Sequence, residues 1–130
     1  LGLVTVGFEL ERRVSNLLAH GESTRALLLD AAGSAAAEEA ADELEKRLHA
    51  GRTHRRFSPG YGSWALTAQR ALFELLPHQD VGVELLSSCL MMPRKSVSFA
   101  VWLGSESETY LPQSRCRACG RIGCPYREGE

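Results

Sequence analysis

Residues 22–49 read ESTRALLLDAAGSAAAEEAADELEKRLH, and this is the longest stretch of the chain with a helical pattern. Its apolar positions recur with a period near 3.6, as in a helix with one buried face. They are Leu27, Ala31, Ala35, Ala37, Ala41, Leu44 and Leu48. Gly33 lies near the centre, where a missing side chain favours close approach of another backbone or of a ligand. The stretch predicts one long helix that ends at about His49.

The flanking segments predict a mixture of helices and strands. Before the long helix, apolar residues from Phe8 to Leu18 recur at helical spacing, and Gly21 suits the end of that helix. After it, Thr67 is expected to cap a short helix that stops at Pro77. Strands are expected at residues 3–6, 81–86 and 96–103. Helices and strands without regular alternation indicate the α+β class.

Composition limits the functions that the chain can have. Its 130 residues, 44% hydrophobic and 24% charged, are typical of one globular domain. The net charge of -1 argues against nucleic acid or an anionic membrane as a partner.

No apolar run approaches the roughly 20 residues of a membrane span, and no secretory signal is evident. We therefore expect a cytoplasmic protein. Leu1 stands within a strand-like run, which suggests that a front part of the domain is missing.

The cysteines favour a metal or thiol site over a disulfide scaffold. Cys116, Cys119 and Cys124 lie within nine residues, and nearby glycines permit tight turns. Zinc and a [4Fe-4S] cluster both take four ligands, so the fourth would be Cys89, a histidine or a partner's residue, unless that position is open. Redox-active thiols and inert cysteines are the alternatives. Residues 114–130 are expected to form a separate cysteine-rich tail.

Residues 56–62, Arg-Phe-Ser-Pro-Gly-Tyr-Gly, combine features suited to a ligand. Arg56 offers a planar fork of donors for a carboxylate or phosphate. Gly60 permits unusual backbone angles, and Tyr61 supplies a flat face with a polar tip. Such a loop fits a small zwitterion with an aromatic end. Taken alone, the pattern is more often that of an ordinary turn.

The residues from Arg56 to Tyr61 resemble the Arg-x-x-x-Gly-Tyr loop of the activation domain of cobalamin-dependent methionine synthase. Two later segments, residues 82–85 and Met-Met-Pro-Arg-Lys-Ser-Val-Ser at 91–98, look like that family's Gly-x-x-Leu strand and its Met-x-Pro-x-x-Ser-Val-Ser segment. Residues 41–49 are similar to its long helix ending in Leu-His. The resemblance covers about residues 22–103, and it is closest to small stand-alone members that also carry a cysteine cluster.

The resemblance implies a fold and a set of ligand-binding residues. The fold would be long helices packed on a twisted, mainly antiparallel sheet, over residues 1–113. Arg56 would bind the carboxylate of S-adenosylmethionine. The backbone of Ser58, Gly60 and Tyr61 would contact the same ligand. An acidic contact falls on Asp42, although Glu43 is the alternative if the helical phase differs. Tyr110 is the nearest candidate for a further tyrosine of the family.

The resemblance also implies a reaction and partners. The chain would assist the reductive methylation of an inactive cobalamin carried by a corrinoid-binding protein or by a methionine synthase core. A flavodoxin-like protein would donate the electron, and S-adenosylmethionine the methyl group. The chain would then be the reactivation component of a methyltransferase in methionine biosynthesis. The alternative is an adaptor of the same fold that binds a metal or an iron–sulfur cluster and does not bind S-adenosylmethionine.

Overall fold

The computed structural model describes residues 1–49, 56–62 and 64–101. Strand β1 (Gly2–Thr5) is followed by the helices α1 (Phe8–Ala19) and α2 (Ser23–His49). The later elements are β2 (Arg56–Phe57), the 3-10 turn η1 (Leu66–Ala68), α3 (Gln69–Leu75), β3 (Glu84–Leu85), β4 (Met91–Met92) and β5 (Ser96–Val101). Helices thus combine with small antiparallel sheets, which confirms the predicted α+β class.

β5 is the central strand of the larger sheet. It pairs antiparallel with β1 on one side and with β2 on the other. In this register Gly2 lies opposite Phe99, and Arg56 lies opposite Val101. The strands β3 and β4 form a separate antiparallel pair. The strand expected at residues 3–6 is therefore confirmed as far as Thr5.

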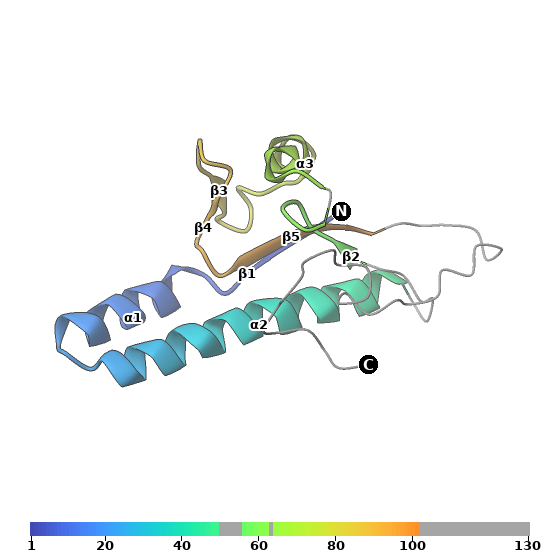
Figure 1. Ribbon diagram of the computed structural model, residues 1–130. Coiled ribbons are helices and arrows are strands. Elements are labelled where there is room, and N and C mark those ends of the chain that lie inside the picture. Colours follow the sequence, from blue (N-terminus) through green and yellow to red (C-terminus); the bar gives the residue numbers. More distant parts are fainter. Residues whose placement is uncertain (50–55, 63, 102–130) are drawn as a thin grey trace.

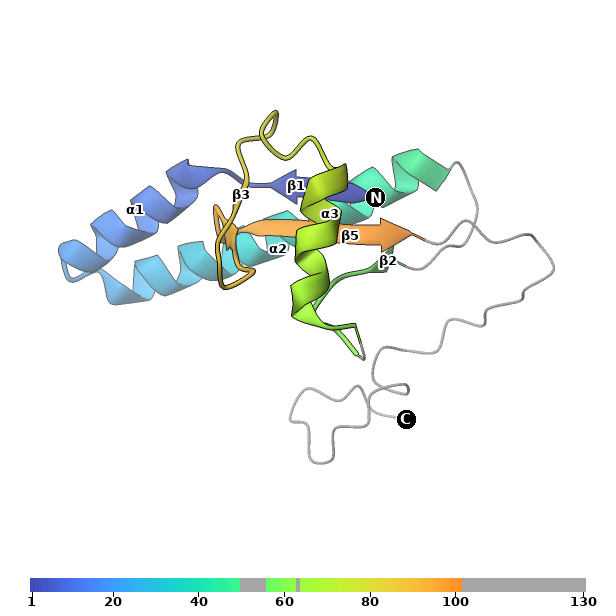
Figure 2. The same cartoon turned by 90° about the horizontal axis from the view of Figure 1, so that it is seen from above.

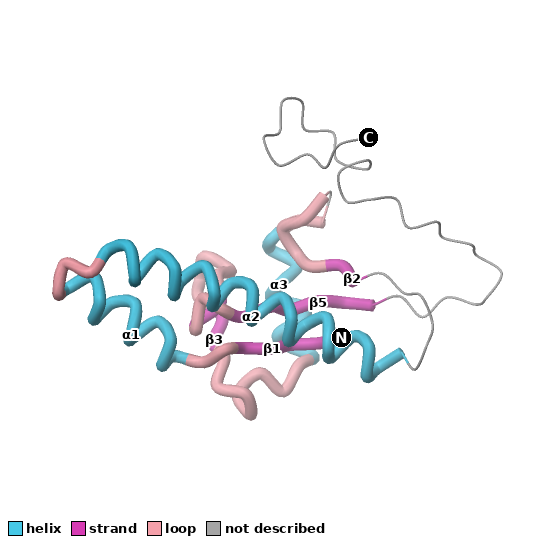
Figure 3. The backbone as a smooth tube through the Cα atoms, turned by 90° about the horizontal axis from the view of Figure 1, so that it is seen from below, coloured by secondary structure: helices cyan, strands magenta, loops and turns pink. Residues whose placement is uncertain are grey.

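The sheet lies between helices. Figure 1 shows the hairpin of α1 and α2 on one side of β1 and β5, with α3 on the other side. Seen from above, α3 crosses over β5 (Figure 2), and seen from below, α2 runs along the sheet (Figure 3). The tip of the helical hairpin extends beyond the strands. The two faces of β5 are therefore covered by different helices.

The hairpin packs through small residues. Its core consists of Val14 and Leu17 from α1 with Ala26 from α2, and Leu10 packs against it. Gly33 is buried beside Leu10: a Cβ there would lie 2.7 Å from the Leu10 Cδ2 atom. The close approach expected at Gly33 is therefore confirmed, and the neighbour is a helix.

The buried face of α2 differs in part from the predicted stripe. Ala37 and Ala41 are buried as expected, whereas Leu27 and Leu48 are exposed at 69% and 53%. The remaining buried positions are Ala26 and Gly33. α2 turns its smallest residues toward α1, β1 and β5 because these let the neighbouring backbones approach closely. Side-chain hydrophobicity alone assigned the wrong phase to the first half of the helix.

The helix ends follow local chemistry, with one exception. Gly21 has φ 75°, and two hydrogen bonds close the end of α1, from Gly21 N to Leu18 O and from Glu22 N to Leu17 O. This is a Schellman motif, so the predicted glycine stop is confirmed. α3 ends at Leu75, just before Pro77, as predicted. The expected cap at Thr67 is wrong, because Thr67 lies inside η1 and caps neither helix.

The later strands are shorter than predicted. Residues 81–82 belong to a turn in which Gly82, at φ 67°, donates its N–H to Gln79 O. Only Glu84–Leu85 of the predicted strand at 81–86 is extended and paired. β5 begins at Ser96 as expected, and residues 102–103 lie outside the described part. In the described ranges, no helix is long and apolar enough to cross a membrane.

Candidate functional site

Arg56 is the first residue of the edge strand β2, and its side chain reaches α2. It pairs with Val101 of β5, and its side chain is only 5% exposed. The guanidinium carbon lies 5.4 Å from the centroid of the Phe99 ring. A guanidinium over an aromatic face is held by the negative charge of that face. Phe99 itself is completely buried, so the aromatic ring beneath Arg56 belongs to the core.

Two carboxylates of α2 form ion pairs with the same guanidinium nitrogen of Arg56. Arg56 Nη2 lies 2.6 Å from Glu38 Oε2 and 3.0 Å from Asp42 Oδ1. The two acids stand four residues apart and therefore share one face of the helix. Both carboxylate side chains are about half exposed, at 49% and 50%. The two acids are thus accessible to solvent, whereas the arginine that they contact is buried.

The helical phase brings to Arg56 one of the two acids that the sequence left open. Asp42 contacts Arg56, whereas Glu43 Oε1 accepts a hydrogen bond from Arg47 Nε at 3.0 Å on another face of α2. Glu38, which also contacts Arg56, is the acid that the sequence did not single out. Its signal was its position one helical turn before Asp42.

One nitrogen of Arg56 has no hydrogen-bond partner. Within the described part of the chain, Nη1 is buried and unpaired, while Nη2 makes both ion pairs. A buried donor without an acceptor costs about 1–3 kcal/mol. Buried polar groups in folded proteins are nearly always satisfied. Nη1 is therefore a position where a ligand oxygen would be bound favourably.

The loop after Arg56 is held by its own backbone. Gly60, at φ 90°, donates its N–H to Trp64 O at 2.9 Å, and Tyr61 donates to Ser58 O at 3.2 Å. The Gly60 carbonyl accepts no hydrogen bond from any described residue. The Tyr61 side chain is 67% exposed, so its ring is free to contact a ligand. The loop leaves one backbone acceptor and one aromatic face available.

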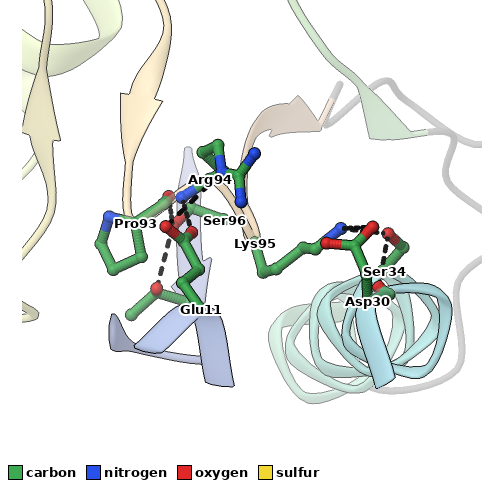
Figure 4. Close-up of polar contacts among 8 residues, drawn as sticks. Glu11, Asp30, Ser34, Pro93, Arg94, Lys95 and Ser96 are labelled. Atoms are coloured by element: carbon green, nitrogen blue, oxygen red, sulfur yellow. Dashed lines mark hydrogen bonds and ion pairs between the residues drawn. The ribbon is translucent and has the colours of Figure 1, made fainter. Parts of the chain in front are cut away.

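A polar network fixes the start of β5 relative to the helices. Figure 4 shows Lys95 reaching α2, where its Nζ atom lies 2.8 Å from both Asp30 Oδ2 and Ser34 Oγ. Arg94 donates its backbone N–H to the Glu11 carboxylate on α1. Ser96 Oγ donates to Pro93 O at 2.6 Å. The network sets the position of β5 and therefore of Phe99 beneath Arg56.

Cys89 lies apart from this cluster, in the turn between β3 and β4. It is buried, with φ 64°, and its Sγ atom accepts a hydrogen bond from Arg70 Nε at 3.3 Å. This contact raises the pKa of the Arg70 guanidinium, which is charged at neutral pH in any case.

Over residues 1–49, 56–62 and 64–101, no group of three or more metal-ligating side chains gathers. Cys116, Cys119, Cys124 and Tyr110 lie outside the described residues.

Comparison with known proteins decides the family. Residues 1–118 match the activation domain of vitamin B12-dependent methionine synthase. The chain belongs to this family. Membership in the activation-domain family confirms the resemblance seen over residues 22–103 and extends it to β1 and α1. It also places the chain in the cobalamin-dependent methionine synthase system, which works through partner domains. No match was found among curated proteins.

Proposed function

We propose that this chain binds S-adenosylmethionine at Arg56 and assists the reductive methylation of a protein-bound cobalamin in a methionine synthase-type system. Family membership supports the part of this proposal that places the chain in a methionine synthase system. The choice of ligand is supported by the buried, unpaired Arg56 Nη1, which lies beside two half-exposed carboxylates. One free donor and a surplus of acids suit a ligand that carries both a carboxylate and positive charge.

The residues present fit the amino-acid end of S-adenosylmethionine. The ligand carboxylate would accept a hydrogen bond from Arg56 Nη1, and the ligand ammonium would be bound by Asp42. The Gly60 carbonyl and the Tyr61 ring would contact the remainder, with Ser58 closing the loop. When bound, S-adenosylmethionine supplies a methyl group activated by its positively charged sulfur. The task of these side chains is positioning, because a sulfonium is already a good leaving group and needs no general acid.

The proposal includes two protein partners. A corrinoid-binding protein or a methionine synthase core would carry the cobalamin, and a flavodoxin-like protein would supply one electron. The chain would act as the reactivation component of a cobalamin-dependent methyltransferase. Nucleic acid and membranes are not proposed as partners, because the sequence has a net charge of only -1.

Titration calorimetry with S-adenosylmethionine tests the ligand. We expect the wild type to bind and Arg56→Ala to bind about 10- to 100-fold more weakly, since a charge-assisted hydrogen bond contributes roughly 1.5–3 kcal/mol. Arg56→Lys keeps the charge but loses the fork, so it should also bind weakly. Arg25→Ala, at an arginine that is 67% exposed on α2, is the matched control and should bind normally. A wild type that releases no heat and shows no binding by equilibrium dialysis would refute the ligand.

The cysteine spacing supports a second candidate, an adaptor that binds zinc or an iron–sulfur cluster through Cys116, Cys119 and Cys124. Cys89 remains the proposed fourth ligand, although a metal would have to reach a side chain that is 4% exposed. Anaerobically purified full-length protein decides this. Absorbance near about 400 nm that disappears in Cys116→Ser indicates a cluster, and stoichiometric zinc in colourless protein indicates a zinc site. Cys89→Ser should lower metal content only if Cys89 is the fourth ligand.

A further inference from the structure

The charges joined at Arg56 do not balance. One guanidinium meets two carboxylates, those of Glu38 and Asp42, so the formal charges of the three side chains are one positive and two negative. The cluster formed by these three side chains therefore carries one surplus negative charge. A carboxylate bound at Arg56 Nη1 would add a second. The ligand that neutralises this site is one that brings a single carboxylate together with two positive charges.

S-adenosylmethionine has this charge pattern, and its demethylated product does not. The methionine end of S-adenosylmethionine carries a carboxylate, an ammonium and a sulfonium. When the methyl group leaves, the S–CH3 bond breaks, its electron pair stays on sulfur, and the sulfonium becomes a neutral thioether. The product, S-adenosylhomocysteine, therefore has one positive charge fewer. Bound at the same donor, it leaves one negative charge of the cluster uncompensated.

With the ligand carboxylate at Arg56 Nη1, the acids of the cluster would lie near enough to the ligand sulfur for this difference to matter. In an amino-acid ligand of this kind, the sulfur lies only a few bonds from the carboxylate. Nη2, which contacts both acids, belongs to the same guanidinium as Nη1. Charges separated by about 5–10 Å beside a protein surface still interact by more than thermal energy at low salt. Because Glu38 is 49% exposed, solvent reduces the effect to a few-fold change in affinity.

We propose that Glu38 is the charge-selecting residue of this site, favouring the sulfonium ligand over its thioether product and so helping the product to leave. The inference rests on the proposed binding of S-adenosylmethionine. Asp42 is assigned to the ligand ammonium, and the charge of Glu38 is the one that the sulfonium balances. Glutamine at this position keeps an oxygen that accepts from Arg56 Nη2, so Glu38→Gln removes the charge while Arg56 stays in place.

Calorimetric titrations of the full chain with both ligands test the proposal. We expect the wild type to bind S-adenosylmethionine more tightly than S-adenosylhomocysteine, and Glu38→Gln to reduce that ratio about three- to tenfold. Glu39→Gln is the matched control: it removes the same charge from the next residue of α2, which is exposed and contacts no described charge. Its ratio should equal that of the wild type. An analogue in which a carbon bearing an ammonium group replaces the methylated sulfur should follow S-adenosylmethionine, since it keeps a positive charge at this position.

The possible outcomes separate the two proposals. An unchanged ratio in Glu38→Gln, with both ligands still bound, overturns the role of Glu38 and leaves the proposed function standing. A wild type that binds both ligands equally overturns it as well. Absence of binding by either ligand to the wild type overturns the proposed function together with this inference. Selectivity that shrinks as salt rises from about 0.05 to 0.5 M supports a charge effect, whereas salt-independent selectivity contradicts it.

Discussion

Phe99 connects two residues that are far apart in the sequence. Its ring lies under Arg56, and the tip of the ring fills the space that a side chain at Gly2 would need. A Cβ at Gly2 would lie 2.3 Å from Phe99 Cζ, which is far inside van der Waals contact. Gly2→Ala should therefore displace either the ring or β1 and lower the free energy of unfolding by about 1–3 kcal/mol.

Urea denaturation measures this effect. The double variant Gly2→Ala/Phe99→Leu should recover part of the loss caused by Gly2→Ala, measured against Phe99→Leu alone, because leucine is smaller and can turn aside. If Gly2→Ala unfolds at the same urea concentration as the wild type, the contact between Gly2 and Phe99 is not as close as described.

Gly60 is required for its backbone angle. Its φ is 90°, and among the described residues a Cβ there would meet only the Leu66 side chain, at an ordinary 3.4 Å from Cδ1 and 4.0 Å from Cβ. Gly60→Ala should therefore cost about 1–2 kcal/mol through backbone strain alone. Asparagine tolerates positive φ better than alanine, so Gly60→Asn should cost less. Equal losses of unfolding free energy in the two variants would contradict this explanation.

At the scale of elements, a buried hydrogen bond joins α3 to β5. Ser98 Oγ of β5 donates to Gln69 Oε1 of α3 at 3.0 Å, and both residues are almost completely buried. Ser98→Ala should leave the Gln69 oxygen without this donor and lower the free energy of unfolding by about 1–3 kcal/mol. Gln69→Leu/Ser98→Ala, which removes both polar groups, should be more stable than Ser98→Ala. Thermal unfolding of the three proteins checks the order.

At the scale of the whole molecule, ligand binding should stabilise the fold, because the proposed site joins α2, β2 and β5. A ligand at about 100 times its dissociation constant adds about 2.7 kcal/mol to the free energy of unfolding. We expect S-adenosylmethionine to raise the melting temperature of the wild type and to raise that of Arg56→Ala clearly less at the same concentration, because the variant should bind about 10- to 100-fold more weakly. An equal increase in both proteins would indicate binding elsewhere.

Much of the architecture could be predicted from local sequence. The two long helices, the glycine that ends α1 and the proline after α3 depend on residues only a few positions apart. Arg56 and Asp42 could be proposed because the motif around them resembles a known family. The strand at 81–86 was predicted too long because the turn at Gly82 competes with pairing there. Thr67 failed as a cap because the 3-10 turn begins before it.

The sequence by itself thus determined which segments form helices, where most of these end, and the family to which the chain belongs. Only the tertiary structure decided which face of α2 is buried, that Glu38 joins Asp42 at Arg56, and that Phe99 lies beneath the guanidinium. The physical reason is range. Propensity, capping and periodicity act over a few residues, whereas these contacts join α2, β2 and β5, whose positions depend on packing around the small residues of α2.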